Sequence, residues 1–561
     1  MALNPVEQRL VELQGLWQDF LADAGRRLLL WQVPDNARRL LHAFFEAQRH
    51  DLPGGAPYVG TDTFIVFDSS FENSMQYARA LKAELAGQYA ASGDAFKPLG
   101  IEPDWGFSPA QVPDSAAAWV QALNALAAHH PALGHLVAVL MPATVADEPA
   151  RLAWLQRALQ AGPSPRVRLV VLDSLETPVL ASLAGDEQVH AQVHAQVVRM
   201  DAWDLARDTF AQSPAVGAAG VFRTLLAGLF GLVDKGTANQ VMAKATDALA
   251  FAHRQGWQDQ EVVVRMLAAG AMLKERRFDE AVVHHRHART VAEHLVSAGH
   301  PVGGQLVLQT WFGEASAHLA ADDLPRAAGC YAQAEPVARE LAHPILWIEA
   351  LRMQLHCLAR SGEPDAALAC GLRALQVGEQ HLKPPARPMT TLPWVATELL
   401  QLADAHRAGQ LQAIRQRLEQ DMAQLRRDTE QRAAALEQAG DAAQTRSSLL
   451  ALEAAQVERA EALTRQARQE ADALASPTQG PLKGLIHRQS HPAHPQAPGR
   501  DTFATVYAQA RALLGPDWPL GRSALAGPDE AAPDAEAWNR PAPDSERAAA
   551  ATLAPAGVGT P

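Results

Sequence analysis

Short apolar runs alternate with longer amphipathic segments over the first 210 residues. TFIVFD (63–68), HLVAVLM (135–141) and VRLVVLD (167–173) are almost continuously apolar, and HAQVVRMD (194–201) is a fourth candidate. Such runs predict strands that are buried on both faces of a parallel sheet. The segments between them, 74–91, 115–130 and 148–162, have helical spacing. Residues 1–210 therefore predict a Rossmann-like α/β domain with a helical lead-in at 5–50.

Helix follows helix from 215 to 385, and three segments fit one helix–turn–helix template. Small residues stand where two helices cross, and large residues fill the adjoining groove. The template positions are Ala269, Met272, Phe278, Ala281, His285 and Ala288 in the first segment, Trp311, Ala315, His318, Leu324, Ala327, Tyr331 and Ala334 in the second, and Leu351, Leu355, Leu358, Ala367, Gly371 and Ala374 in the third, with Gly362 in its turn.

This template resembles the tetratricopeptide repeat, which implies an α-solenoid with a protein-binding surface. The anchoring alanines Ala281, Ala327 and Ala367 are 46 and 40 positions apart, whereas the standard period is about 34. The helices or turns must therefore be longer than in the usual unit. A degenerate earlier copy is expected at 218–255, and a plain helical bundle is the alternative.

Apolar residues recur every 11 positions between 395 and 475. Leu411, Met422 and Ala433 form one such series, and Leu452, Leu463 and Leu474 form another. This period corresponds to about 3.67 residues per turn and predicts nearly straight helices. Gly440 and Asp441 separate the halves, which favours an antiparallel helical hairpin. One continuous coiled-coil rod is the alternative, and either form would offer a homo-oligomer contact.

Residues 476–561 are rich in Pro, Gly and Ala and poor in large apolar residues. They predict a largely disordered tail, because they cannot bury enough surface to offset chain ordering. DTFATVYAQARALLG (501–515) is the exception and predicts a short helix or docking peptide. The fold class is thus multidomain and mostly α, with one N-terminal α/β domain.

The net charge of −13 (49 basic against 62 acidic residues) argues against nucleic acid or an anionic membrane surface as the partner. The longest apolar stretch, 214–233, is interrupted by Arg223 and predicts a buried helix, so we expect a cytoplasmic protein without membrane insertion. Cys330, Cys357 and Cys370 lack metal-ribbon spacing and predict small buried side chains.

Motifs for catalysis are sparse. VRLVVLDSLE resembles a Walker B strand ending at Asp173 and Glu176, but no GxxxxGK[ST] or GxGxxG motif accompanies it. Asp68 could meet Asp173 at the carboxyl edge of the sheet. Glu187, His190 and His194 would share a face if helical and could bind zinc, but an alternating strand fits them better. We therefore expect no enzyme activity and no cofactor.

The segment HHRHAR gathers basic and titratable side chains on one repeat helix. Its candidate residues for binding an acidic peptide are His284, His285, Arg286, His287 and Arg289. A repeat array presents such residues along a groove. The alternative is the solvated outer face of a helix.

The leading hypothesis is a protein-binding adaptor or chaperone-like scaffold whose repeats hold other proteins or peptides. WQVPDNARRLLHAFFEAQ (31–48) resembles bacterial accessory proteins that escort effectors of contractile, type VI-like secretion systems. That resemblance assigns no functional residue. One alternative is a degenerate regulatory NTPase-like sensor with a repeat array. Another is a metal-dependent hydrolase using Asp68, Asp173 and residues 187–194.

Overall fold

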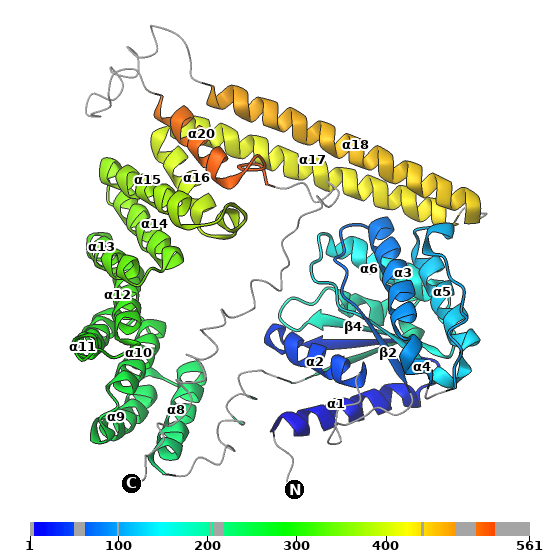
Figure 1. Cartoon of the computed structure of the whole chain (residues 1–561), viewed down its shortest axis with the longest axis horizontal. Coiled ribbons are helices and arrows are strands. Elements are labelled where there is room, and N and C mark those ends of the chain that lie inside the picture. Colours follow the sequence, from blue (N-terminus) through cyan, green and yellow to red (C-terminus); the bar gives the residue numbers. More distant parts are fainter. Residues whose placement is uncertain are drawn as a thin grey trace.

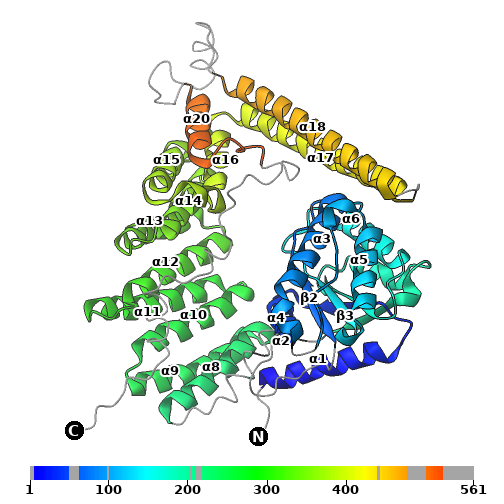
Figure 2. The same ribbon diagram turned by 45° about the vertical axis from the view of Figure 1, so that its right-hand side comes forward.

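The computed structural model describes residues 5–49, 62–97, 100–198, 217–438, 442–476 and 501–521, with positions 200, 205 and 208. These residues form an α/β domain, a stack of paired helices and a long helical hairpin (Figure 1). The hairpin extends from the last helices of the stack to the α/β domain, as two views show (Figures 1 and 2). The tail predicted to be disordered lies, apart from 501–521, outside the described residues.

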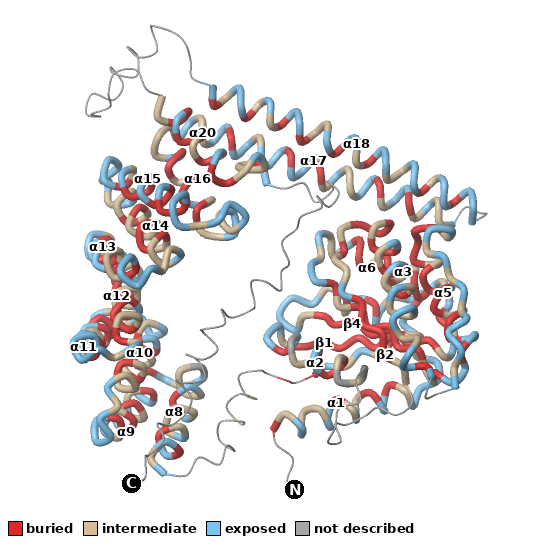
Figure 3. The backbone as a smooth tube through the Cα atoms, viewed as in Figure 1, coloured by how far each residue is buried: buried red, intermediate tan, exposed pale blue. Residues whose placement is uncertain are grey.

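A five-stranded parallel sheet forms the centre of the α/β domain, in the order β2-β3-β4-β1-β5. Leu30 in β1 lies opposite Val171 in β4 and Ala195 in β5. β2, β3 and β4 are almost wholly buried (Figure 3), as their apolar composition predicts. The strands span Leu28–Val33 (β1), Thr63–Phe67 (β2), Leu136–Leu140 (β3), Val167–Ser174 (β4) and Val193–Val197 (β5).

Helices cover both faces of this sheet. One face packs α1 and α2 through Trp17, Phe44 and Phe45, and the other packs α3, α5 and α6 through residues such as Trp119 and Trp154. The helices span Pro5–Ala22 (α1), Arg38–Arg49 (α2), Ser74–Ala91 (α3), Gly93–Phe96 (α4), Ala116–His129 (α5) and Glu148–Gln160 (α6).

The four predicted strands are confirmed. The prediction that residues 5–50 are helical is wrong for residues 28–33, which lie between two helices. Residues 28–33 form β1, which pairs with both β4 and β5 and is therefore an interior strand. Its sequence, LLLWQV, is too short to show a period, and strand or helix fits it equally well in isolation. Only the two neighbouring strands, more than 130 residues later in the chain, select the extended form.

Eight consecutive helices, α8 to α15, pack against one another in chain order, and α16 continues the stack. Contacts also join α8 to α10, α10 to α12 and α14 to α16, so alternate helices form one layer, as in a solenoid. The bounds are Ala218–Lys235 (α8), Ala238–Gln255 (α9), Gln258–Lys274 (α10), Phe278–Ser297 (α11), Gly303–Ala320 (α12), Leu324–Glu340 (α13), Pro344–Arg360 (α14), Pro364–His381 (α15) and Leu392–Ala403 (α16).

The three template copies coincide with the pairs α10–α11, α12–α13 and α14–α15. Small residues stand at their crossings for a steric reason. At Gly371 an added Cβ would lie 2.5 Å from a methyl of Leu399 on α16. Gly362 adopts φ +80° between α14 and α15, which suits the turn expected there. The stack is therefore a solenoid of long helix pairs. α8, predicted to be buried, is only partly so, since Val221 and Phe230 are exposed.

The hairpin consists of α17 (Ala405–Gln438) and α18 (Ala442–Ala475). Buried positions along α17 include Leu411, Met422 and Ala433, which is the predicted 11-residue series. α20 (Thr502–Leu514) packs onto α15, α16 and α18, so the segment 501–515 is a docked helix. Arg407 of α17 holds it through Asp501, with both guanidinium–carboxylate distances at 2.6–2.7 Å. Within the described residues, no helix is both long and apolar enough to cross a membrane.

Candidate functional site

A buried carboxylate joins two helix pairs at the middle of the stack. Glu314 on α12 is 2% exposed and accepts a 2.7 Å hydrogen bond from Nε of Arg286 on α11. Its second oxygen accepts from Arg289, whose guanidinium lies 3.5 Å from the ring centroid of Trp311. Burial raises the pKa of Glu314, but the hydrogen bonds from Arg289 and Arg286 outweigh it and hold the pKa below its usual value. These two ion pairs of Glu314 thus connect α11 to α12.

Three further polar side chains surround Glu314. His318, one turn later on α12, and Cys330 on α13 are both buried, and each offers a ligand atom within 4.8 Å of the others and of Glu314. His285 on α11 lies against Gly313 and is 4% exposed. Burial lowers the pKa of His285 to about 4 and raises that of the Cys330 thiol to about 12. Both groups are therefore neutral near pH 7.

The five predicted partner-binding residues are divided between the interior and the surface. His285 is buried, and Arg289 is mostly covered by its contacts with Glu314 and Trp311. His284 is half-buried, while Arg286 and His287 are exposed. The idea that these residues bind a partner stays a prediction, and Arg286 and His287 are the members that a partner could reach without rearrangement.

An exposed apolar patch occurs on the last turn of the stack, around the start of α16. Trp394 is 64% exposed and Met389, at the end of the 3₁₀ segment Pro384–Met389, is 79% exposed. The guanidinium of Arg352 on α14 lies 5.5 Å from the Trp394 ring centroid, and Glu349 holds that guanidinium at 2.6 and 2.8 Å. We call Met389, Trp394 and Arg352 the Trp394 patch.

Sequence reasoning missed this patch, although a signal for it exists. The buried residues of α16 are Leu392, Val395, Ala396, Leu399 and Leu400. Their spacing defines one apolar stripe, and Trp394 lies outside it. A tryptophan off the stripe of an amphipathic helix predicts exposure. Among the tryptophans that the structure describes, Trp394 alone is classed as exposed.

Ligands of open α/β folds bind at the carboxyl edge of the sheet. They bind between two adjacent strands when the segment after one strand covers one face of the sheet and the segment after the other strand covers the opposite face. β1 and β4 meet this condition, because α2 and the 3₁₀ segment Leu180–Gly185 pack on opposite faces. Here, however, the Glu176 carboxylate accepts the Asp35 N–H, and Asp173 accepts the N–H groups of residues 179–181 at 3.0 Å. The chain's own carboxylates therefore occupy backbone donors that a phosphate would need.

The other carboxylate and histidine candidates of this domain are not brought together. β3 lies between β2 and β4, so the ends that carry Asp68 and Asp173 are two strand spacings apart, about 10 Å. His194 belongs to β5, whereas His190 lies in the short 3₁₀ segment His190–Gln192. The strand interpretation of this segment is confirmed for residues 193–197, and the shared helical face does not form.

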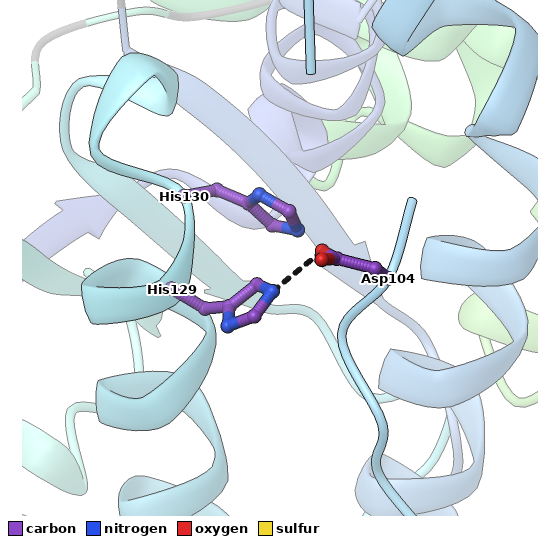
Figure 4. Close-up of side chains that lie close together, drawn as sticks. All are labelled: Asp104, His129 and His130. Atoms are coloured by element: carbon purple, nitrogen blue, oxygen red, sulfur yellow. Dashed lines mark hydrogen bonds and ion pairs between the residues drawn. The ribbon is translucent and has the colours of Figure 1, made fainter. Parts of the chain in front are cut away.

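A cluster of Asp104, His129 and His130 lies at the end of α5, near the amino edge of the sheet (Figure 4). His129 Nε2 and Asp104 Oδ1 are 2.7 Å apart, and this hydrogen bond lowers the pKa of Asp104. His130 is instead engaged through Nε2 with the Tyr89 hydroxyl at 2.8 Å. Asp104 and His129 then remain as an exposed hydrogen-bonded pair of an ordinary kind.

A cavity of about 430 Å³ opens between α1 and β5. Leu13, Leu16 and Val198 contribute to its apolar lining, and Glu12 and Asp19 are the charged residues that border it. A ligand site normally has several convergent polar groups. Arg9 already pairs with the Glu12 carboxylate at 2.9 Å, so the two carboxylates at the border of the cavity do not supply such a set.

No protein-family model matches this chain, and no curated protein matches it. The solved structures that match it include the following two. BtubC (BKLC) from P. vanneervenii is 17% identical with a TM-score of 0.28, over 43% of this chain and 89% of that one. The second is a signal transduction ATPase with numerous domains and a tetratricopeptide repeat sensor from Pyrococcus horikoshii. It is 9% identical with a TM-score of 0.22, over 89% of this chain and 91% of that one. The fold described above rests on this chain's own packing.

Proposed function

We propose that this protein is a scaffold that binds another protein, and that the Trp394 patch is its principal contact. The exposure of Trp394 on a well-packed helix carries the proposal. Tryptophan and arginine dominate the binding energy of protein interfaces, and an exposed ring leaves a large apolar area in water. Arg352 makes a cation–π contact with the Trp394 ring, so the Trp394 side chain is already positioned in the absence of a partner.

The layered helices support the same function. A solenoid exposes a continuous surface along one layer of helices, and α14 and α16 are neighbours in that layer. Arg286 and His287 are also exposed, but they lie on α11, in the other layer of helices. Their predicted role in binding a partner is therefore separate from the Trp394 patch.

The residues that suggested a secretion-system role, 31–48, form the end of β1 and most of α2. Their aromatic side chains, such as Trp31 and Phe44, are buried in the α/β core. This part of the chain is therefore accounted for by folding, and the proposal concerns protein binding without a stated pathway. A homo-oligomer contact through 395–475 remains a separate prediction, testable by the mass of the purified protein in solution.

The test replaces Trp394 and Met389 together by alanine in the full chain. Partners of the native chain are first identified by affinity capture and mass spectrometry, and the affinity of a purified partner is then measured. Removing a central tryptophan costs about 2 kcal/mol or more, so we expect at least ~30-fold weaker binding.

A matched control replaces Val283 and Val296, which are exposed apolar residues on α11, by alanine. These side chains lie in the other layer of helices, and we expect unchanged affinity. Equal affinity of the Trp394/Met389 variant and the native chain for every purified partner would refute the Trp394 patch as the contact.

A further inference from the structure

The buried polar cluster between α11, α12 and α13 has the donor types of a transition-metal site. Glu314 and His318 are four residues apart on α12, so both project from the same face of that helix. Cys330 reaches them from α13, and the three potential ligand atoms lie within 4.8 Å of one another. Carboxylate oxygen, imidazole nitrogen and thiolate sulfur are the ligands that Zn²⁺ takes in proteins.

Unsatisfied nitrogens distinguish this cluster from an ordinary polar network. His318 is 6% exposed, yet its Nε2 has no hydrogen-bond partner among the described residues and stands 3.7 Å from Oε1 of Glu314. Buried imidazoles normally form at least one hydrogen bond. Its Nδ1 lies 3.9 Å from Asp323, a carboxylate in the position that orients metal-bound histidines. Within the part of the chain that the structure describes, both ring nitrogens of His285, which lies against Gly313, are also without a hydrogen-bond partner.

The charges around Glu314 allow a cation to enter by exchange. In the present arrangement one carboxylate is paired with two guanidinium groups, which leaves one net positive charge. Arg289 is held against Trp311, but the Arg286 side chain is 55% exposed and can turn into solvent. A divalent cation adds two positive charges. The departure of Arg286 and the loss of the Cys330 thiol proton each remove one positive charge, so the net charge of the cluster is unchanged.

We propose that Glu314, His318 and Cys330 form a binding site for a thiophilic divalent cation of the zinc class. The cation joins α12 to α13 within the stack and releases Arg286 from Glu314. Arg286 is an exposed member of the segment 284–289, so binding of the cation also frees its guanidinium group for other contacts. This site is independent of the Trp394 patch, which lies on α14 and α16.

The test uses the full chain, stripped of metal by a chelator under reducing conditions and titrated with Co²⁺ without oxygen. Thiolate ligation gives a sulfur-to-cobalt absorption band in the near ultraviolet. We expect one Co²⁺ per chain, displacement by Zn²⁺, and a higher melting temperature with Zn²⁺. His318→Gln should weaken binding at least ~10-fold, and Arg286→Gln should strengthen it because the competing cation is removed.

Cysteine variants supply the decisive comparison. Cys330→Ser should lose the band, whereas Cys370→Ser, which removes another buried cysteine on α15, should keep it. Circular dichroism shows whether each variant is folded. If Cys330→Ser does not fold, His318→Gln takes its place as the test of the site. The proposal is overturned if the native chain binds no Co²⁺ saturably, or if folded Cys330→Ser or His318→Gln retains the native band and affinity.

Discussion

Glu430, near the end of α17, accepts a 2.7 Å hydrogen bond from the backbone N–H of Ser74, 356 positions earlier in the chain. Ser74 opens α3, so the carboxylate of Glu430 lies at the positive end of that helix. Arg157 of α6 donates to the Ser74 hydroxyl at 2.7 Å and pairs with Glu437 at 3.3 Å. Met75 adds an apolar contact with Ala433 and Leu449. These contacts join the hairpin to the α/β domain.

Glu430→Ala should loosen this junction without unfolding either side. The substitution leaves the buried Ser74 N–H without its partner, which costs about 1–3 kcal/mol. We expect faster amide hydrogen exchange in the first turn of α3 and at the end of α17, while β3 and β4 remain protected. Glu419→Ala is the matched control, because Glu419 lies on the same helix, is exposed and, among the described residues, pairs with Arg415 alone. Unchanged exchange at Ser74 would contradict the contact.

The junction should weaken as the pH rises. Burial raises the pKa of Glu437 from 4.5 to about 7, against the opposing charge of Arg157 and with support from Glu430. The docked state therefore binds the proton more tightly than the free hairpin, and docking is strongest below about pH 4.5 and declines until pH passes about 7. This pKa shift of Glu437 corresponds to a loss of docking free energy of at most about 3 kcal/mol over that pH interval.

Limited proteolysis between pH 5 and 8 measures this dependence, because release of the junction exposes the end of the hairpin. Glu437→Gln cannot ionise and should show little change over the same interval. A native protein whose junction is equally protected at pH 5 and pH 8 would rule out this linkage.

Lys82→Met should destabilise the α/β domain strongly. Lys82 is fully buried on α3 and donates to the carbonyls of Pro109, Val112 and Pro113 and to Asp114. Its removal leaves three carbonyls without this donor, at about 1–3 kcal/mol for each unsatisfied buried group, while Asp114 keeps Arg79 as a partner at 2.8 Å. Denaturant unfolding followed by tryptophan fluorescence measures the loss. Lys97→Met, at an exposed lysine paired with Asp94, should change stability by less than about 0.5 kcal/mol.

Two glycine substitutions in neighbouring helices should act in opposite directions. At Gly313 an added Cβ would lie 2.2 Å from Cε1 of His285, so Gly313→Ala should cost about 1–3 kcal/mol. At Gly329 on α13 nothing lies within 4 Å, and Gly329→Ala should stabilise by about 0.5–1 kcal/mol. Thermal unfolding of both variants measures the contrast, and a neutral Gly313→Ala would show that His285 is not held there.

Local patterns predicted several elements correctly because the relevant forces are local. The β-branched runs at 63–67, 136–140 and 167–173 are strands, and the 11-residue series through Leu411, Met422 and Ala433 is the buried face of α17. The helix pairs of the stack follow the small-residue template. The exposed Trp394 could also have been predicted, because it lies outside the apolar stripe of its own helix.

Other features depend on partners that are distant along the chain. β1 is a strand because β4 and β5 supply its hydrogen bonds, and LLLWQV contains no period that would select this form. His285 and Arg289 face inward because Gly313 and Glu314 on the next helix leave space and a counter-charge for them. No local spacing encodes these neighbours.

The amino-acid sequence alone indicated four strands of the α/β domain, the paired helices and the long helices of the hairpin, since each follows from a pattern within about 20 residues. Tertiary structure alone decided which polar groups meet. Ser74 is hydrogen-bonded to Glu430, and Glu314 to Arg289, because packing removes these groups from most of the water and places each beside a complementary polar group. Such pairing depends on the relative position of whole elements, and a one-dimensional pattern does not contain it.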